Sequence, residues 1–123
     1  MKLLTALLLT AGLFAQNPAI QRTIVQRKDI SMPGREAVVA RVEIAPGGSA
    51  GRHTHTGEEI SYVMDGELEV LVEGQPPLTV KTGESFVIPA GAKHDARNKG
   101  SVPVKLAAVY LVEKGKPLAT PAP

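Results

Sequence analysis

The sequence contains no cysteine and no tryptophan, and aromatic residues make up only 3% of its 123 residues. Without cysteine the chain can form no disulfide bond, offers no thiolate as a metal ligand or nucleophile, and has no site for a lipid-modified cysteine behind a leader. The interior must therefore be built mainly from Val, Ile, Leu and Ala, within a normal apolar share of 43%.

The chain also lacks any run of charges of one sign. Its formal net charge is +2, and its basic residues are scattered without interleaved aromatic side chains. Lys93, Arg97 and Lys99 do lie close together, but we interpret them as a solvated surface. This pattern, and the lack of a helix-turn-helix, favour a protein with no nucleic-acid partner.

No apolar run is long enough to span a bilayer, which requires about 20 residues. The longest, Leu3 to Ala15, follows the positive charge of Lys2. These features predict a secretory signal peptide over residues 1–15, with cleavage after Ala15. Leu13, the third residue before that cut, is larger than the small residue usual there. A buried first helix is the alternative. The prediction implies a periplasmic or secreted protein with no stable membrane anchor after cleavage.

Short apolar segments between glycines and prolines dominate the rest of the chain. From Ala37 to Ile44, apolar and polar side chains alternate with the period of two that marks a half-buried strand. Asp65-Gly66 is a strong hairpin signal. Strands are predicted over residues 37–44, 60–64, 67–73, 78–81, 86–88 and 102–112, the last covered on both faces. The fold class is therefore all-β, a sandwich or barrel.

The chain is long enough for one domain but not for two independent cores. We expect this domain over residues 37–113. Residues 16–36 lead into it and contain one apolar pair, Ile24 and Val25, which could form an edge strand. Residues 114–123 contain three prolines and little to bury, so we expect a mobile tail.

The candidate functional residues are the three histidines of the chain and one glutamate. His53 and His55 are one residue apart, so on a strand both side chains point to the same face. Glu59 follows after a tight corner, and a closed barrel could bring His94 opposite them. Such nitrogen and oxygen donors suit Mn, Fe, Co, Ni, Cu or Zn. An isolated histidine, however, is more often a surface residue or a hydrogen-bonded core residue.

The spacing of these residues forms two motifs. In the first motif, one residue separates the two histidines, three residues separate the second histidine from the glutamate, and six separate the glutamate from a glycine. The second motif places a histidine shortly after Pro-x-Gly. The ten fixed positions are Gly47, His53, His55, Glu59, Gly66, Gly83, Pro89, Gly91, His94 and Asn98. All ten match the two motifs of the cupin superfamily, so the chain resembles its small single-domain members from about Ala37 to Val112.

The resemblance implies a jelly-roll β-barrel, also called a double-stranded β-helix, with one divalent transition metal near one mouth. It carries the ligand roles over to His53, His55, Glu59 and His94. Glu58 competes with Glu59 for the carboxylate position, but adjacent residues on a strand face opposite ways, and the family spacing selects Glu59. Asn98 is expected to be a structural residue.

Cupins include oxygenases, decarboxylases, isomerases, lyases and binding proteins, so the family does not fix the activity. If Glu59 and His94 point inward, Ser61, Val63 and Ala96 share their faces, which predicts a largely apolar cavity with few acid–base groups. This favours an exported metal-dependent enzyme, a dioxygenase being one candidate, that acts on a small oxygen-bearing organic molecule. The alternative is a non-catalytic protein that binds a small molecule or a metal complex.

A metal that only rigidifies the barrel ranks last, because a structural site has no use for open coordination positions. Small cupins commonly dimerise through edge strands, and Arg22 to Val25 is the candidate for such pairing. We therefore expect a homodimer.

Overall fold

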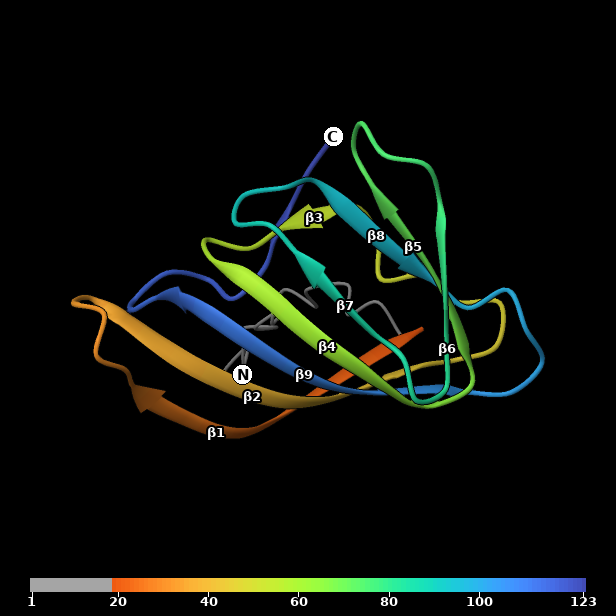
Figure 1. Ribbon diagram of the computed structural model, residues 1–123, viewed down its shortest axis with the longest axis horizontal. Helices are drawn as coiled ribbons and strands as arrows, with labels where there is room; N and C mark the ends of the chain where they lie inside the picture. The colour runs from red at the N-terminus through yellow and green to blue at the C-terminus, as the bar shows by residue number, and fades with distance from the viewer. Residues whose placement is uncertain (1–18) are drawn as a thin grey trace, which may run out of the picture.

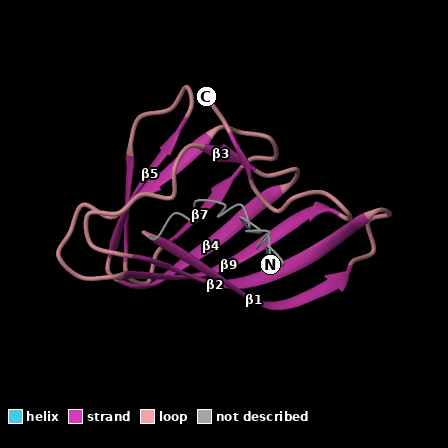
Figure 2. Ribbon diagram, turned by 180° about the vertical axis from the view of Figure 1, so that it is seen from behind, coloured by secondary structure: helices cyan, strands magenta, loops and turns pink. Residues whose placement is uncertain are grey.

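The computed structural model describes residues 19–123, which form ten β-strands joined by turns and loops (Figures 1 and 2). The signal peptide predicted over residues 1–15 lies outside the described residues. Within residues 19–123 there is no helix with the length and apolarity needed to cross a membrane. The predicted all-β class is confirmed.

Two five-stranded sheets face each other. The first has the order β1 (Ile20–Asp29), β2 (Arg35–Ile44), β9 (Val104–Glu113), β4 (Glu58–Asp65) and β7 (Ser85–Ile88). The second has the order β10 (Thr120–Pro121), β3 (His53–Thr54), β8 (His94–Arg97), β5 (Glu67–Val72) and β6 (Leu78–Lys81). Neighbouring strands within each sheet are antiparallel, and strands distant in sequence pair (Figure 1).

The core fills the space between the sheets. Alternate residues of β2 and β9 point inward, and the antiparallel register sets Val38 against Tyr110 and Val42 against Leu106. The buried apolar residues are Val38, Ala40, Val42, Ile44, Val63, Leu68, Val70, Val80, Phe86, Ile88, Val104, Leu106, Ala108, Tyr110 and Val112. The expectation that β9 is covered on both faces is wrong, because its outward residues are exposed or only half-buried.

β1 is longer than the apolar pair Ile24–Val25 indicated. It runs for ten residues along the edge of the first sheet and pairs with β2, with a bulge between Ile24 and Gln26. Most of its side chains are exposed, so the strand carries no apolar alternation. Backbone pairing rather than side-chain burial holds it in place, and it brings Arg22 to the mouth of the barrel.

Residues 114–123, which were expected to have little to bury, contact the barrel at several points. Leu118 is half-buried against the core, and β10 pairs with β3, with Thr120 opposite Thr54. The backbone N–H of Ala122 also donates to the carbonyl of Arg52, 3.0 Å away. The tail therefore lies along β3, the strand that carries His53; the C-terminus is marked in Figure 1.

Asn98 ties the end of β8 to two other segments. Its buried amide Nδ2 donates to the carbonyl oxygens of Ile44 and Val102, 3.0 and 2.8 Å away, while its Oδ1 accepts from the Gly100 N–H. All the polar atoms of this side chain are hydrogen-bonded to backbone groups, which confirms its expected structural role.

Gly57, which lies between the candidate ligands His55 and Glu59, has no space for a side chain. A Cβ atom there would overlap the carbonyl oxygen of Leu111 on β9. We expect Gly57→Ala to lower the free energy of unfolding by about 1–3 kcal/mol, the usual cost of overpacking, because backbone must move. Urea denaturation measures it. Gly100→Ala is the matched control, since the nearest atom there is a side-chain oxygen at 3.4 Å; equal effects would contradict the prediction.

Candidate metal centre

The four candidate ligands come from both sheets and meet between them. His53 on β3 lies directly opposite His94 on β8 in the second sheet, and Glu59 reaches across from β4 in the first. His55 follows β3 in the loop that leads to β4. All four side chains are buried, with exposed fractions between 3% and 7%. The barrel therefore assembles residues that are up to 41 positions apart (53 to 94) in one interior site.

The donor atoms of the four residues lie within 4.8 Å of one another. One oxygen of Glu59, Oε1, is 3.0 Å from Nε2 of His55 and 3.5 Å from Nε2 of His94. Glu58 is exposed on the opposite face of β4, as the alternation of strand side chains predicts. The structure thus brings together the quartet expected from the sequence and leaves Glu58 out of it.

A backbone carbonyl fixes the orientation of each imidazole ring. Nδ1 of His53 faces the carbonyl oxygen of Gly51, that of His55 faces Leu118, and that of His94 faces Ala92, with distances of 2.5, 2.6 and 2.8 Å. A carbonyl oxygen only accepts, so each Nδ1 carries the proton and donates it. Each Nε2 of a neutral ring then presents a lone pair to the centre of the cluster.

This arrangement matches the donor set of a transition-metal site. Three lone pairs and a carboxylate converge, and Nε2 of His94 is buried without a hydrogen-bond partner. A cation between the donors satisfies all of them at once, and histidine ligands in metal sites commonly donate their other N–H to a carbonyl or carboxylate. The residues present therefore could hold one metal ion.

Glu59 stays ionised in spite of its burial. Burial by itself raises the pKa of this carboxyl, but the neighbouring imidazoles of His55 and His94 and the hydroxyl of Ser61 outweigh it and hold the pKa well below its usual range. Ser61 contributes directly, since its hydroxyl donates to Oε2 of Glu59 at 2.7 Å. The site therefore keeps one fixed negative charge.

His53 is kept neutral. Burial lowers the pKa of its imidazole to about 4, helped by the nearby His94, His55 and Arg22 and opposed by the hydrogen bond to Gly51. A neutral ring retains the lone pair that metal coordination needs.

Two residues beside the cluster were missed in the sequence. Arg22 on β1 places a guanidinium nitrogen 3.4 Å from Nε2 of His53. Tyr110 on β9 is opposite Glu59 in the strand register, and its ring centroid is 4.7 Å from that of His55. Burial and the charge of Glu59 raise the pKa of Tyr110 to about 12, so it remains a neutral phenol. In the sequence, Arg22 belonged to the polar entry segment and Tyr110 to an apolar strand, so neither was a candidate site residue.

The cavity at the cluster is small, with a volume of about 20 Å³. Its walls are mostly apolar, as expected, and the residues that line it are Ile20, Arg22, Val42, Ile44, Ala50, His53, Glu59, Val70, Phe86, His94, Ala96, Leu106 and Tyr110. Apart from the candidate ligands, only Arg22 and Tyr110 among these described residues carry ionisable groups.

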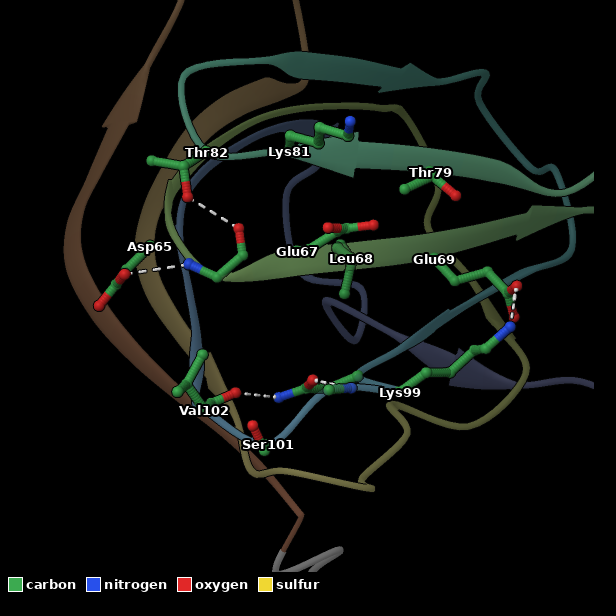
Figure 3. Close-up of a pocket in the computed structure, with 13 residues that line it drawn as sticks. Asp65, Glu67, Leu68, Glu69, Thr79, Lys81, Thr82, Lys99, Ser101 and Val102 are labelled. Atoms are coloured by element: carbon green, nitrogen blue, oxygen red, sulfur yellow. Dashed lines mark hydrogen bonds and ion pairs between the residues drawn. The ribbon is translucent and has the colours of Figure 1, made fainter.

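A wider hollow of about 650 Å³ opens elsewhere, along β5, β6 and the loop after β8 (Figure 3). None of the four candidate ligands lines it. Its charged side chains are exposed or paired, as Lys99 is with Glu69 at 3.0 Å. It offers no group of converging donors comparable to the cluster.

Comparison with known proteins points to one family. The sequence profile of the cupin domain matches residues 40–110. The chain is 39% identical over 77 residues to germin-like protein subfamily 2 member 2 of Arabidopsis thaliana, a match that covers 58% of this chain and 35% of the relative. The chain thus spans about a third of the length of this relative.

Two further similarities concern proteins of small oxyacids. The chain is 30% identical over 83 residues to an oxalate-binding protein of Thermotoga maritima, with 67% of this chain and 68% of the relative covered. A solved structure of recombinant oxalate oxidase in complex with glycolate superimposes with a TM-score of 0.67 at 26% identity, covering 87% of this chain and 57% of the other. The expected double-stranded β-helix fold is thereby confirmed.

We expect the stability of the metal-free protein to fall as the pH decreases from 6.5. The imidazole of His53 has its ordinary pKa of 6.5 in the unfolded chain, whereas burial lowers this pKa to about 4 in the folded protein. Between these values the unfolded state binds more protons, so the free energy of unfolding decreases with falling pH. Below the usual carboxyl pKa of 4.5, protonation of Glu59 on unfolding acts in the same direction.

Urea denaturation between pH 7 and about 5 avoids the range in which carboxyl groups titrate, and comparison with a His53 variant then isolates the contribution of His53. His53→Asn should show a smaller slope of stability against pH than the parent protein. An unchanged slope would contradict the assignment.

Proposed function

Because the chain belongs to the cupin family, we propose that its buried cluster binds one divalent transition metal and that the loaded site is an enzyme centre for a small oxygen-bearing organic molecule. One observation carries the proposal: three Nε2 lone pairs and the Glu59 carboxylate converge within 4.8 Å, with every Nδ1 proton directed to a carbonyl. A metal cation between these donors would complete the set.

His53, His55, Glu59 and His94 would hold the metal. When bound, it supplies Lewis acidity or the activation of dioxygen, since four protein ligands on a six-coordinate ion leave two positions open. The other residues act around it. Ser61 orients Glu59 by donating to Oε2, and Phe86, Val70 and the apolar wall exclude water and so strengthen electrostatic interactions inside the cavity.

The relatives support a small oxyacid or a similar chelating molecule as the ligand. One is named for binding oxalate, and another was solved with glycolate. Both molecules are small and oxygen-rich, and the cavity beside the donors is also small, about 20 Å³. We extend this to the present chain as part of the proposal.

A non-catalytic binding protein is the second candidate, and the cavity lining favours it. Beyond the four candidate ligands, only Arg22 and Tyr110 among the lining residues are ionisable. Arginine remains protonated, and the raised pKa of Tyr110, about 12, leaves no base at neutral pH. Chemistry would then have to rely on the metal alone, whereas capture of a ligand needs no base.

We expect Glu59→Gln to weaken the binding of Mn²⁺ or Co²⁺ by about 10–100-fold or more, because it removes the only anionic donor. Isothermal titration of the metal-free protein measures this. Glu58→Gln is the matched control, being the adjacent glutamate on the exposed face, and should bind like the parent protein. Equal affinities for the two variants would contradict the proposed ligand set.

Dioxygen uptake and product formation by the metal-loaded protein separate the two candidates. The panel comprises oxalate, glycolate, diketones, catechols and flavonols, each with several metals. Turnover that disappears in Glu59→Gln supports the enzyme, whereas saturable binding without turnover across the panel supports the binding protein.

We also propose that the protein is exported and forms a homodimer. The apolar run behind Lys2 supports export, and the exposed edge of β1, where Val25 is 57% exposed, supports pairing between copies. Native mass measurement of the protein recovered outside the cytoplasm tests both points. A monomer, or a mass that retains residues 1–15, would contradict one or the other.

A further inference from the structure

Arg22 occupies an unusual position for a residue of an edge strand. Most of β1 is exposed, yet the side chain of Arg22 lines the cavity together with His53, Glu59 and His94. Its Nε is buried and has no hydrogen-bond partner. The chain therefore places a permanent positive charge, incompletely satisfied, beside the candidate metal ligands.

The present contact of this guanidinium is not compatible with a bound metal. Nη2 of Arg22 is 3.4 Å from Nε2 of His53, the lone pair that metal coordination would use. Once that lone pair is engaged, the guanidinium loses this acceptor. Tyr110 is its other neighbour in the cavity, but a neutral hydroxyl cannot offset its charge.

The charges of the cavity do not balance when the site is loaded. A divalent ion brings two positive charges and Arg22 one, against the single negative charge of Glu59, so the described lining carries two uncompensated positive charges. Charges in a desolvated cavity interact strongly, and an uncompensated one is costly. An anionic ligand between the ion and Arg22 reduces this imbalance by one charge if it is a monoanion such as glycolate and by two if it is a dianion such as oxalate, and its oxygens supply the missing acceptors.

We propose that Arg22 determines the ligand specificity of the site by selecting a small carboxylate over neutral molecules. The inference rests on the proposed function, because it requires a bound metal. A guanidinium matches a carboxylate with two parallel hydrogen bonds, whereas a neutral oxygen compound offers no charge. The cavity is small, about 20 Å³, so the acid must be small as well.

Arg22→Gln tests the proposal through two effects of opposite sign. Affinity of the metal-loaded protein for oxalate or glycolate should fall by about tenfold or more, since a charge-assisted pair is lost. Affinity of the metal-free protein for Mn²⁺, in buffer without carboxylates, should rise by about threefold or more, since a repelling charge is removed. Isothermal titration measures both, and the Mn²⁺ spectrum in electron paramagnetic resonance reports carboxylate binding independently of turnover.

Three controls make the outcome decisive. Glycolamide, the neutral counterpart of glycolate, should bind equally to the parent protein and to Arg22→Gln. Arg27→Gln removes the same charge from the same strand, but at an exposed residue paired with Glu36, and should change neither affinity. Arg22→Lys keeps the charge and loses the paired donors, so it should retain Mn²⁺ affinity and bind carboxylates more weakly.

Failure of this inference differs from failure of the proposed function. If Arg22→Gln binds Mn²⁺ and its oxalate affinity is unchanged, the role of Arg22 is overturned while the metal site stands. A fall of both affinities also overturns it, because loss of a positive charge cannot weaken cation binding electrostatically; normal carboxylate affinity in Arg22→Lys would do the same. If the parent protein binds no metal, the proposed function itself fails.

Discussion

Three hydrogen bonds from imidazole N–H groups to backbone carbonyls determine the character of this site. They run from His53 to Gly51, from His55 to Leu118 and from His94 to Ala92. Each fixes a ring orientation and a tautomer, so the three Nε2 atoms face one another instead of the solvent. Without them the same residues would be three buried polar side chains with no common direction.

The fold places these rings by supplying opposite walls. The second sheet carries His53 and His94 as a directly opposed pair, and the first contributes Glu59, with Tyr110 beside it in the register. The apolar layer between the sheets lowers the local dielectric constant, which makes a fixed charge such as Glu59 effective and an unbalanced one expensive. The apolar packing of the core therefore also determines how strongly the charges in the site interact.

The sequence carried much of this architecture. Period-two alternation located β2, the hairpin signal at Asp65-Gly66 lay between β4 and β5, and the resemblance to cupins, carried by the spacing of histidines, glycines and Pro89, implied both the barrel and the cluster. Two features escaped because their cause is not local. β1 is held by backbone pairing at an edge, which leaves no apolar alternation, and the place of Arg22 follows from that pairing. Tyr110 acquires its neighbour Glu59 only when β9 meets β4.

The tail illustrates how a segment distant in sequence contributes to the candidate metal centre. Residues 114–123 were predicted to form a mobile tail, yet the carbonyl of Leu118 accepts a hydrogen bond from His55, and β10 pairs with β3. Residues 114–123 thereby hold the loop that carries His55 in place. Removal of this segment by a protease would leave all four candidate ligands intact and yet release the ring of His55, because the acceptor of its Nδ1 proton would be lost.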